Sequence, residues 1–438
     1  MSDEPRVLIA AEHASARFGG EAALPLHYFR VLRRRGVPVW LLTHARTRAE
    51  LSVLYPGDEH IHYIEDTPWH RAMWRIGQRL PDGISYATTG FLSRLSTQLA
   101  QRRLARRLVR EHGITVVHQP MPVSPREPST LHSLGAPVLI GPMNGGMDYP
   151  PAFRRHRGVA ERILIGLGRA SATALNRLMP GKRRAATLLV ANRRTREALP
   201  EGLAAQVVEL VENGVDLRLW QAPPAGAEPQ SSPVTTFVYM GRLVDWKAVD
   251  LLLRAFSRAR DQVPMRLWIL GDGSERGRLE ALAAELGIAG DPPGTIGGVH
   301  FAGWLAQSAC AERLRDADAL LLPSLLECGG AVVLEAMSLA KPVIATAWGG
   351  PLDYLDPSCG VLVPPESREA IVAGFAAAMV ELARSEATRR RLGAAGLLKV
   401  QREFDWELKV DRMLALYADA MRRAGPTGAR PAGERRAI

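Results

Sequence analysis

The chain is 438 residues long and carries a formal net charge of +11, with 47% hydrophobic and 23% charged residues. Its length predicts two or three domains at roughly 150 residues each. Its composition excludes a disordered, collagen-like or coiled-coil protein. Residues 1–215 hold 30 Lys and Arg against 18 Asp and Glu, whereas residues 216–438 hold 26 against 27. The basic first half indicates an anionic surface or ligand met by one domain only.

Neither the N-terminal sequence nor the cysteines point to secretion. The first residues lack the basic region and apolar stretch of a signal peptide, and no run approaches 18 apolar residues. Cys310, Cys328 and Cys359 have no zinc-binding or redox spacing, which favours a reducing compartment. We expect a cytoplasmic protein, with any membrane contact being peripheral and at the inner face.

Short apolar segments alternate with amphipathic helical patterns along both halves of the chain. The strands predicted in the first half are 6–10, 37–43, 114–118, 136–141, 188–191 and 207–211. Those predicted in the second half are 235–240, 265–270, 299–302, 319–322, 342–346 and 360–363. Continuous apolar strands separated by helices are typical of parallel sheets covered on both faces. The predicted fold class is α/β, with two doubly wound, Rossmann-like domains.

A segment rich in Pro, Ala, Gly and Ser separates the two series of strands. That composition is typical of a linker. We therefore predict an acceptor-binding domain over 1–218, a linker over 219–233 and a donor-binding domain over 234–404. A helix over 405–423 is expected to pack back towards the first domain, and 424–438 to form a mobile tail.

Two cations follow the predicted strand 235–240, in the sequence YMGRLVDWK. Arg242 offers a planar fork to phosphate oxygens and Lys247 a point charge, while Gly241 permits a tight turn. An adjacent helix N-terminus would add oriented amides, so the group suits a diphosphate. Taken alone, these residues equally fit a solvated Arg and Lys at a helix start.

Two carboxylates eight residues apart follow the predicted strand 319–322, in ECGGAVVLE. If a loop begins this segment and a helix ends it, Glu327 and Glu335 can face one ligand. Carboxylates that accept hydrogen bonds from vicinal hydroxyls are a common way to hold a sugar. The alternative is one capping and one solvated acid at a helix start.

At this point the chain resembles a known family. The ordered segments GRLVDWK, LWILGDG, HFAGW, LLLPSLLECGGAVVLEAM and KPVIATAWGG are similar to those of glycosyltransferase family 4, as are FGGE and NGVD in the first half. The resemblance spans about residues 6–420. It implies the GT-B fold, retention of anomeric configuration and independence of metal.

The resemblance also implies roles for residues of the second domain. Gly241, Arg242 and Lys247 would hold the donor diphosphate. Glu335 would bind the ribose hydroxyls, and Glu327 the donor sugar. Two further pairs would line the donor pocket: Gly329 with Gly330 around the sugar, and Gly303 with Leu305 beside the base.

In the first domain, the resemblance places Gly19 and Gly20 near the distal phosphate. It places His118, in VVHQP, near the reacting sugar, although the residue alone would more often be a core histidine. The implied catalytic residues are His118, Glu327, Arg242 and Lys247.

Three positions depart from the family pattern: Ala248 replaces a glycine, Gly329 an aromatic residue and Asp353 a glutamate. They indicate a subfamily rather than a lost site.

Other motifs are weaker. Gly271, Gly273 and Gly277 nearly form a dinucleotide fingerprint, but Arg276 takes the third glycine position. Asp316 and Asp318 resemble a metal-binding DxD motif but precede an apolar strand, where solvated acids are common. We expect no metal, no cofactor and no nucleic acid. His60, His62 and His70 are expected to be solvent-exposed.

The segment 91–110 predicts a basic amphipathic helix of the kind that lies on anionic membranes. Its apolar side would hold Leu92, Leu95, Leu99, Leu104 and Leu108. Its polar side would hold Arg102, Arg103, Arg106, Arg107 and Arg110, with Trp69 and Trp74 upstream. A surface helix packed on its own sheet is the equal alternative.

The predicted function is transfer of a sugar from a nucleotide diphosphate-sugar to a hydroxyl acceptor. The acceptor would be a glycan or lipid-linked glycan of a cell-surface polysaccharide. Two alternatives remain from the sequence. One is a non-catalytic nucleotide-sugar-binding protein, and the other an epimerase or phosphorylase on the same fold.

Overall fold

The structure is a computed structural model that describes residues 4–80, 85–156, 173–203, 206–221, 234–290 and 295–425. The chain forms two compact units. Unit 1 comprises Met1–Gly145, Ile165–Glu212 and Val410–Ile438, and unit 2 comprises Gly146–Leu164 and Asn213–Lys409. Most of the predicted linker (222–233) and of the predicted mobile tail (426–438) lies outside the described residues.

Within the described residues, unit 1 holds a seven-stranded sheet in the order β3-β2-β1-β4-β5-β6-β7. Its strands are β1 (Val7–Ala10), β2 (Val39–His44), β3 (Ile61–Ile64), β4 (Val116–Gln119), β5 (Val138–Met143), β6 (Thr187–Val190) and β7 (Gln206–Glu209). All neighbours pair in parallel. Sequence order reverses between β1 and β4, which makes the carboxyl ends of these two strands a topological switch point.

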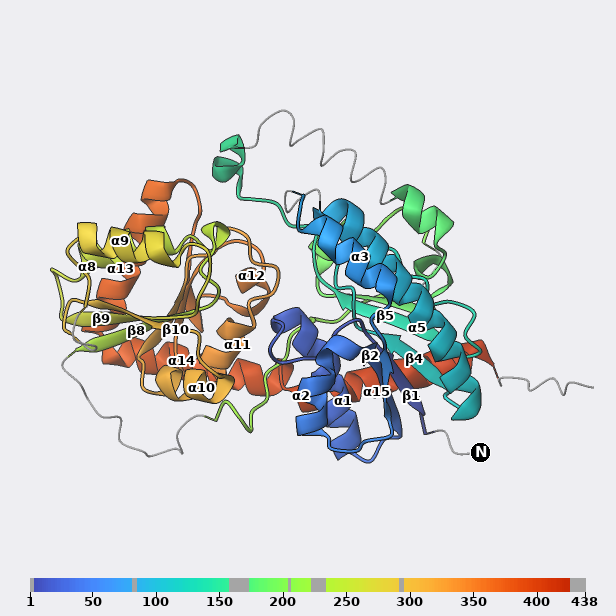
Figure 1. Cartoon of the computed structure of the whole chain (residues 1–438). Coiled ribbons are helices and arrows are strands. Elements are labelled where there is room, and N and C mark those ends of the chain that lie inside the picture. The colour runs from blue at the N-terminus through green and yellow to red at the C-terminus, as the bar shows by residue number, and fades with distance from the viewer. Residues whose placement is uncertain are drawn as a thin grey trace, which may run out of the picture. The chain divides into compact units, whose positions relative to one another are not determined.

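Helices cover the sheet of unit 1 (Figure 1). They are α1 (Gly20–Arg34), α2 (Arg48–Leu54), α3 (Pro68–Gly77), α5 (Phe91–Glu111), α7 (Arg193–Glu197) and most of α15 (Trp406–Ala424). Short turns lie at η1 (Ala45–Thr47), η2 (Tyr86–Gly90) and η4 (Lys182–Arg184). Ala105, Leu108 and Val109 of α5 pack with sheet residues in one buried cluster.

Unit 2 repeats the arrangement with a six-stranded sheet in the order β10-β9-β8-β11-β12-β13. Its strands are β8 (Thr235–Met240), β9 (Met265–Leu270), β10 (Val299–Gly303), β11 (Ala319–Leu322), β12 (Val343–Thr346) and β13 (Gly360–Val363). Every pairing is again parallel. Sequence order reverses here between β8 and β11.

Helices lie on both faces of the sheet of unit 2, with α8, α9 and α13 on one side and α10 and α14 on the other (Figure 1). The helices are α8 (Val249–Ala259), α9 (Arg276–Glu285), α10 (Gln307–Arg315), α11 (Ala331–Ser338), α12 (Pro351–Tyr354), α13 (Arg368–Arg384) and α14 (Glu386–Glu403), with turns η3 (Pro151–His156) and η5 (Asp245–Lys247). The two sheets confirm the predicted α/β class and doubly wound topology.

Strand β3 was not among the predicted strands. Its sequence, IHYI, buries Ile61 and Ile64 and leaves His62 and Tyr63 half-buried. It is an edge strand whose central His62 and Tyr63 interrupt the apolar run that marks the predicted strands. Of the three histidines expected to be exposed, His60 is exposed and His62 is half-buried. The expectation is wrong for His70 of α3, which is buried at 2% exposure. Its side chain completes a capping box with Thr67 at the start of the helix.

The boundaries of the units differ from the predicted domains in more than one place. Residues 213–218 belong to unit 2, although the predicted first domain ends at 218. Residues 146–156, also within the predicted first domain, belong to unit 2 as well. Trp348 Nε1 donates to the carbonyl of Asp148 at 2.8 Å, and Met147 packs against Gly349. These contacts hold the segment to the loop after β12.

The last helix, α15, belongs to unit 1 from Val410 onwards. Tyr417 bonds His118, and Arg423 donates to the carbonyl of Ala186 at 3.1 Å and to the Thr187 hydroxyl at 2.8 Å. Buried Met413, Tyr417 and the basic end of the helix thus fix the C-terminal segment to strands β4 and β6.

Candidate functional site

The predicted donor residues of unit 2 gather where its strand order reverses. Gly241, Arg242 and Lys247 follow β8, and Glu327 follows β11. These two strands are neighbours in the sheet, so the loops after them leave it side by side. In open parallel sheets this is where ligands bind.

The turn after β8 is held by the strand itself. Tyr239 is buried, and its hydroxyl donates to the carbonyl of Arg242 at 3.0 Å. The amide of Gly241 donates to Leu270 at 2.9 Å, which joins the turn to the end of β9. Arg242 is exposed, and no carboxylate pairs with its guanidinium within the described ranges. A fixed backbone therefore presents a free cation at the carboxyl edge of the sheet.

Lys247 and Glu327 form an ion pair across the switch point. Their side chains are 17% and 11% exposed, so the pair is largely removed from water. Ala248, at the position where the family pattern has glycine, adopts the left-handed conformation with φ 51°. The backbone that glycine would favour is thus kept, and it starts α8 directly after the lysine.

The loop that carries Glu327 is fastened at both sides. Leu325 N–H donates to the carbonyl of Trp246 at 2.9 Å, and Gly350 N–H donates to that of Glu327 at 2.7 Å. A Cβ on Gly350 would lie 2.1 Å from the carbonyl oxygen of Gly329, so no other residue fits this approach. The loop after β12 therefore supports the loop after β11.

Glu335 lies on α11. This helix begins directly after Gly330, whose backbone adopts the left-handed conformation. The side chain of Glu335 is half-buried and contacts Gln307 at the start of α10. Removal from water raises the pKa of Glu335 to about 7, although the hydrogen bond from Gln307 opposes this. The carboxylate also raises the pKa of Cys310, next to it on α10, after the larger effect of burial.

The loop after β10 lies close to these residues. Gly303 has φ 72°, and its carbonyl accepts a hydrogen bond from Gly271 N–H at 2.8 Å. Leu305 follows, and its carbonyl accepts a weak hydrogen bond from the Cys310 thiol at 3.8 Å. Cys310 thus connects this loop to Glu335 on the neighbouring helix.

Two buried hydroxyls at this edge have no partner among the described residues. They are Ser324 Oγ, two residues after β11, and Thr346 Oγ1, at the end of β12. A buried hydroxyl without a hydrogen bond costs about 1–3 kcal/mol. Such groups are expected where a ligand or ordered water completes the structure.

In unit 1, Gly19 and Gly20 lie at the start of α1. Both are exposed, and a Cβ on either would meet nothing within 4 Å. Gly19 needs its flexibility because its φ is 102°. The site offers open amides at a helix N-terminus, and the predicted contact with a distal phosphate stays a prediction.

His118 lies in a setting that does not suit the role near the reacting sugar. It is fully buried, Nε2 donates to the carbonyl of Gly141 at 2.7 Å, and Nδ1 accepts from the Tyr417 hydroxyl at 2.7 Å. Burial lowers its pKa to about 4, so the ring is neutral near pH 7. With both nitrogens occupied, His118 links β4 to β5 and α15.

Replacing His118 is expected to affect stability first. His118→Leu leaves the buried Tyr417 hydroxyl and Gly141 carbonyl unpaired, and should lower the free energy of unfolding by about 2–4 kcal/mol. Urea unfolding measures this, and adding Tyr417→Phe should restore part of the loss. A catalytic role would instead lower the transfer rate while leaving unfolding unchanged.

Sequence reasoning missed a polar group at the switch point of unit 1. Glu12 follows β1 and Glu127 lies in the loop after β4, and Arg94 Nε donates to Glu127 at 2.9 Å. Burial raises the pKa of Glu12, which Arg94 opposes and Glu127 reinforces. The feature of the sequence that could have identified Glu12 and Glu127 is that each follows one of two adjacent strands.

The described ranges contain one cluster with the geometry for a metal: His44, Asp66 and His70. Nδ1 of His44 accepts from the amide of Arg46 at 3.3 Å, and Nδ1 of His70 from that of Thr67 at 3.2 Å. Both rings therefore carry their proton on Nε2, whereas a ring ligating through Nε2 would carry it on Nδ1. Arg46 also pairs with Asp66, so the cluster suits a hydrogen-bonded core better than a cation.

The DxD-like pair also has a structural setting. Asp318 accepts from Thr236 N–H at 2.8 Å and lies 3.5 Å from Arg389.

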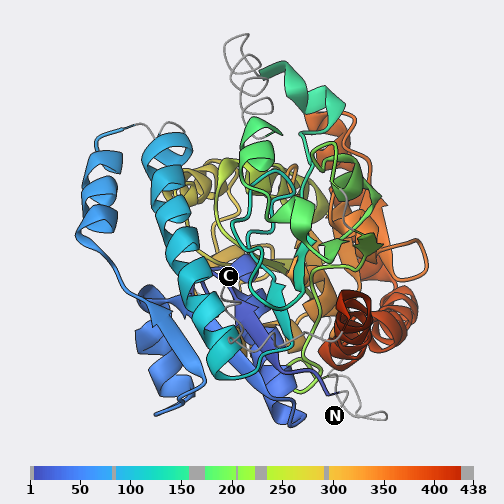
Figure 2. The same cartoon turned by 90° about the vertical axis from the view of Figure 1, so that its right-hand side faces the viewer.

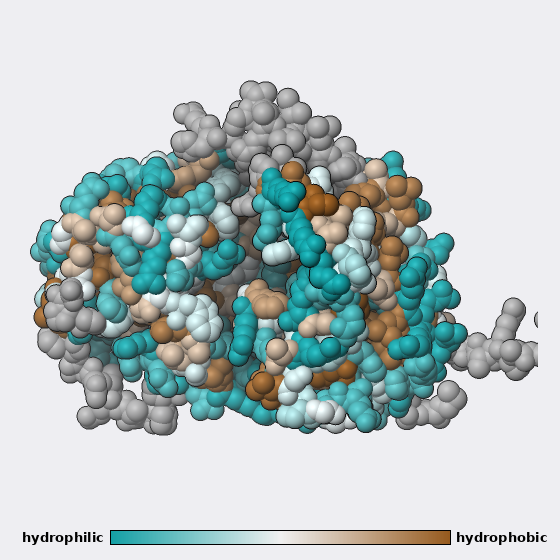
Figure 3. All heavy atoms as spheres, viewed as in Figure 1, coloured by the Kyte–Doolittle hydropathy of each residue, from teal (hydrophilic) through white to brown (hydrophobic). Residues whose placement is uncertain are grey.

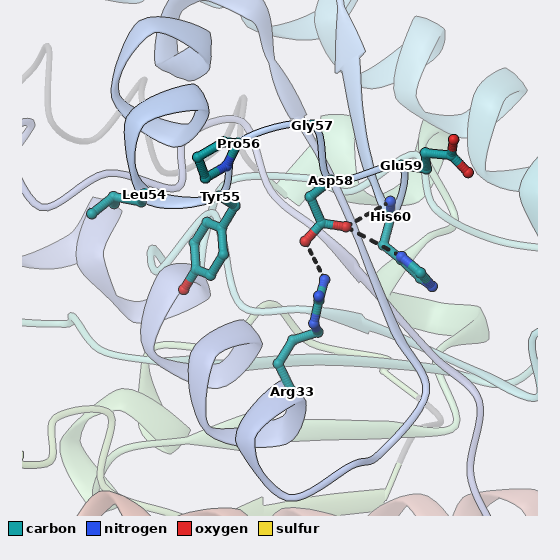
Figure 4. A pocket seen from close by; sticks show the side chains of 8 residues that line it. All are labelled: Arg33, Leu54, Tyr55, Pro56, Gly57, Asp58, Glu59 and His60. Atoms are coloured by element: carbon teal, nitrogen blue, oxygen red, sulfur yellow. Dashed lines mark hydrogen bonds and ion pairs between the residues drawn. The ribbon is translucent and has the colours of Figure 1, made fainter.

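A separate depression of about 420 Å³ lies between α1 and the loop before β3 (Figure 4). There Asp58 bonds Arg33 and His60, and although burial opposes it, these bonds hold its pKa below the usual range. Of the residues that line this depression, Arg33, Asp58 and His60 are thus paired with one another.

Comparisons with known proteins find glycosyltransferases. Residues 227–397 match the family model "Glycosyl transferases group 1". The chain is 32% identical over 191 residues to a lipopolysaccharide core biosynthesis glycosyltransferase, LpsE, of Rhizobium meliloti, covering 43% of this chain and 51% of that protein. It is 32% identical over 232 residues to D-inositol 3-phosphate glycosyltransferase of Segniliparus rotundus, covering 50% and 48%. The chain thus spans about half the length of the curated relatives it matches.

Solved structures match over nearly the whole chain. A glycosyltransferase from Rickettsia africae aligns with a TM-score of 0.64 at 16% identity, covering 95% of this chain and 99% of that one. WaaG, a glycosyltransferase involved in lipopolysaccharide biosynthesis, aligns at 0.58 with 15% identity, covering 94% and 99%. HepE of Anabaena, solved with UDP and glucose, aligns at 0.59 with 15% identity, covering 94% and 100%. At these identities the likeness shows the GT-B fold.

Proposed function

We propose that this protein is a retaining glycosyltransferase that moves a sugar from a nucleotide diphosphate-sugar to a hydroxyl of a glycan or lipid-linked glycan. The observation that carries the proposal is the partly buried Lys247–Glu327 pair beside exposed Arg242 at the switch point of unit 2. The match of residues 227–397 to group 1 glycosyl transferases supports the same reaction.

The donor diphosphate would be held by charge and by amides. Arg242 and Lys247 stabilise the negative charge that grows on the departing phosphate. The N-terminus of α11, reached through Gly329 and Gly330, adds oriented N–H groups. These groups would neutralise the charge of the diphosphate, as a divalent cation does in other enzymes, so the reaction would need no metal.

The sugar portions would be read by the two glutamates. Glu335 accepts hydrogen bonds from the ribose hydroxyls, and Glu327 from hydroxyls of the transferred sugar. The ion pair with Lys247 would orient the Glu327 carboxylate. Gly303 and Leu305 border the base.

The proposed chemistry is attack from the face that the diphosphate leaves. The bond from the anomeric carbon to the phosphate oxygen breaks, and a bond from that carbon to the acceptor oxygen forms. The acceptor proton passes to the departing phosphate oxygen, and a nucleoside diphosphate is released. In unit 1, Glu12 and Glu127 would accept hydrogen bonds from acceptor hydroxyls, with Arg94 holding Glu127.

The direct test is release of nucleoside diphosphate from UDP-, GDP- and dTDP-sugars, with and without a bacterial-type lipid extract. One base should support release well above the others, and EDTA should leave the rate unchanged. Release with none of the three would oppose the proposal. Strong inhibition by EDTA that Mn²⁺ reverses would overturn its metal-independent form.

Donor affinity is expected to rise with pH. The pKa of Glu335 is about 7 because the side chain is removed from water, and only its ionised form accepts two ribose hydrogen bonds. From pH 6 to pH 8 the affinity for the nucleoside diphosphate should rise about tenfold, following the ionised fraction. Calorimetric titration measures this.

Two matched variants test whether ionisation of Glu335 causes the dependence of donor affinity on pH. Glu335→Gln should remove the dependence on pH, whereas Glu285→Gln, an exposed position on α9, should keep it. Because the pKa of Glu335 is raised on folding, its contribution to stability is lost as pH rises from about 4.5 to about 7. Unfolding is therefore checked at each pH. Equal pH dependence in Glu335→Gln and the wild type would contradict the assigned role.

A further inference from the structure

The helix α5 exposes apolar side chains in its first half and buries polar ones. Leu92 and Leu99 are each 43% exposed, whereas Thr97, Gln98 and Gln101 are buried. Gln98 accepts from Thr130 N–H at 3.1 Å and the Thr97 hydroxyl donates to the carbonyl of Ser93 at 3.1 Å, whereas Gln101 Nε2 has no partner among the described residues. This differs from the predicted division into a leucine side and an arginine side, because only Leu108 of that set is fully buried.

The outward side of α5 is one continuous stripe. Leu92, Leu95 and Leu99 recur at intervals of three and four residues, and Arg103, Arg106 and Arg110 continue the same spacing. Residues at this spacing share one face of a helix. The stripe is therefore apolar over its first half and cationic over its second.

The neighbouring helix α3 adds aromatic side chains and further cations. Figure 2 shows the two helices side by side, and His70 Nε2 of α3 bonds Ser96 at 2.8 Å and Thr97 at 3.1 Å. Trp69 is 48% exposed and Trp74 is 63% exposed. Figure 3 shows hydrophobic side chains among hydrophilic ones over these helices.

The charge of this surface is almost wholly positive. From 68 to 110 the sequence has nine arginines and one acidic residue, Asp82. Six of the arginines are exposed and have no ion pair within the described ranges: Arg71, Arg75, Arg79, Arg103, Arg106 and Arg110. Among the described residues, none of the helices meets the length and hydrophobicity of a membrane span.

We propose that the outward surface of α3 and α5, here called the α3–α5 surface, docks on an anionic lipid bilayer. Unpaired arginines attract acidic headgroups, at about tenfold in affinity for every one to two of them near the surface. Tryptophan and leucine side chains enter the boundary between headgroups and acyl chains. This proposal does not depend on the proposed reaction.

Other partners fit the same residues less well. A protein interface depletes charge at its centre, whereas arginines lie along the whole α3–α5 surface. Single-stranded nucleic acid binds in a basic groove with stacking platforms, and this surface is formed by two convex helices. The α3–α5 surface therefore carries part of the excess positive charge of the first half of the chain, and its proposed partner is an anionic bilayer.

Flotation with lipid vesicles tests the proposal on the full chain. The protein should float with vesicles of 70% phosphatidylcholine and 30% phosphatidylglycerol, and bind pure phosphatidylcholine at least about tenfold more weakly. Replacing Arg103, Arg106 and Arg110 with Gln should weaken binding at least tenfold. The matched control replaces exposed Arg278, Arg390 and Arg391 of unit 2 with Gln, which removes the same charge and should leave binding unchanged.

A second variant tests insertion rather than charge. Trp69→Ser with Trp74→Ser should reduce binding to the acidic vesicles several-fold, and should abolish most quenching of tryptophan fluorescence by brominated lipid. Equal flotation with neutral and acidic vesicles, or equal losses in the unit 2 control, would overturn the proposal. So would binding to DNA without flotation, which would assign the surface to nucleic acid.

Discussion

Lys247→Ala is expected to lower the rate of sugar transfer by between tens and several hundred-fold. The lysine lies at the switch point of unit 2, paired with Glu327 and largely removed from water. In the proposed reaction a cation there would stabilise the departing diphosphate, and loss of one such group would remove roughly 2–4 kcal/mol of transition-state stabilisation. Single-turnover measurement of nucleotide release detects this directly.

Two variants make the result interpretable. Arg242→Ala should have an effect of similar size, because its guanidinium is free to meet the same diphosphate. Arg390→Ala, on the exposed side of α14, removes the same charge and should leave the rate unchanged. Rates near wild type in both Lys247→Ala and Arg242→Ala would remove the basis of the donor assignment.

Gly271→Ala is expected to destabilise unit 2 by about 2–4 kcal/mol. Gly271 has φ 140°, and a Cβ there would lie 1.9 Å from the carbonyl oxygen of Gly241. The clash would push apart the ends of β8 and β9, which carry the turn to Arg242. Urea unfolding should show the loss of stability, and titration with the nucleoside diphosphate a loss of affinity.

Gly277→Ala is the matched control. Gly277 lies in α9, six residues further on, and a Cβ there meets nothing within 4 Å. Alanine is favoured over glycine in a helix by roughly 0.5–1 kcal/mol, so the variant should be as stable as the wild type or slightly more. Equal stability of Gly271→Ala and Gly277→Ala would contradict the close approach of the two turns.

The fold could be predicted from the sequence because its strands are buried on both sides. Runs such as 235–240 and 319–322 are apolar without interruption, and only a covered parallel sheet gives that pattern repeatedly. The edge strand β3 escaped prediction because half of it faces solvent. The near-fingerprint at Gly271, Gly273 and Gly277 is explained by packing. A Cβ on Gly273 would lie 2.2 Å from the carbonyl oxygen of Leu243, whereas Gly277 is unconstrained.

The candidate site was predictable only where chemistry and strand ends coincide. Arg242, Lys247 and Glu327 follow the two strands that flank the switch point, and the structure brings Lys247 and Glu327 into contact. His118 also follows an apolar run, but its partner Tyr417 is 299 residues away, and no local pattern reveals that hydrogen bond. The polarity of α5 was assigned wrongly for a similar reason. Its buried Gln98 has partners in the loop at Pro128 and Thr130, which helical spacing does not show.

The central claim is tested most directly by whether nucleotide release depends on an acceptor. With the preferred nucleotide diphosphate-sugar, release should be slow alone and at least tenfold faster when a lipid-linked glycan is added, with the sugar recovered on the acceptor. Binding without release under either condition would indicate a nucleotide-sugar-binding protein. Turnover of the donor at the same rate without an acceptor would indicate an epimerase or phosphorylase. Either result would contradict transfer.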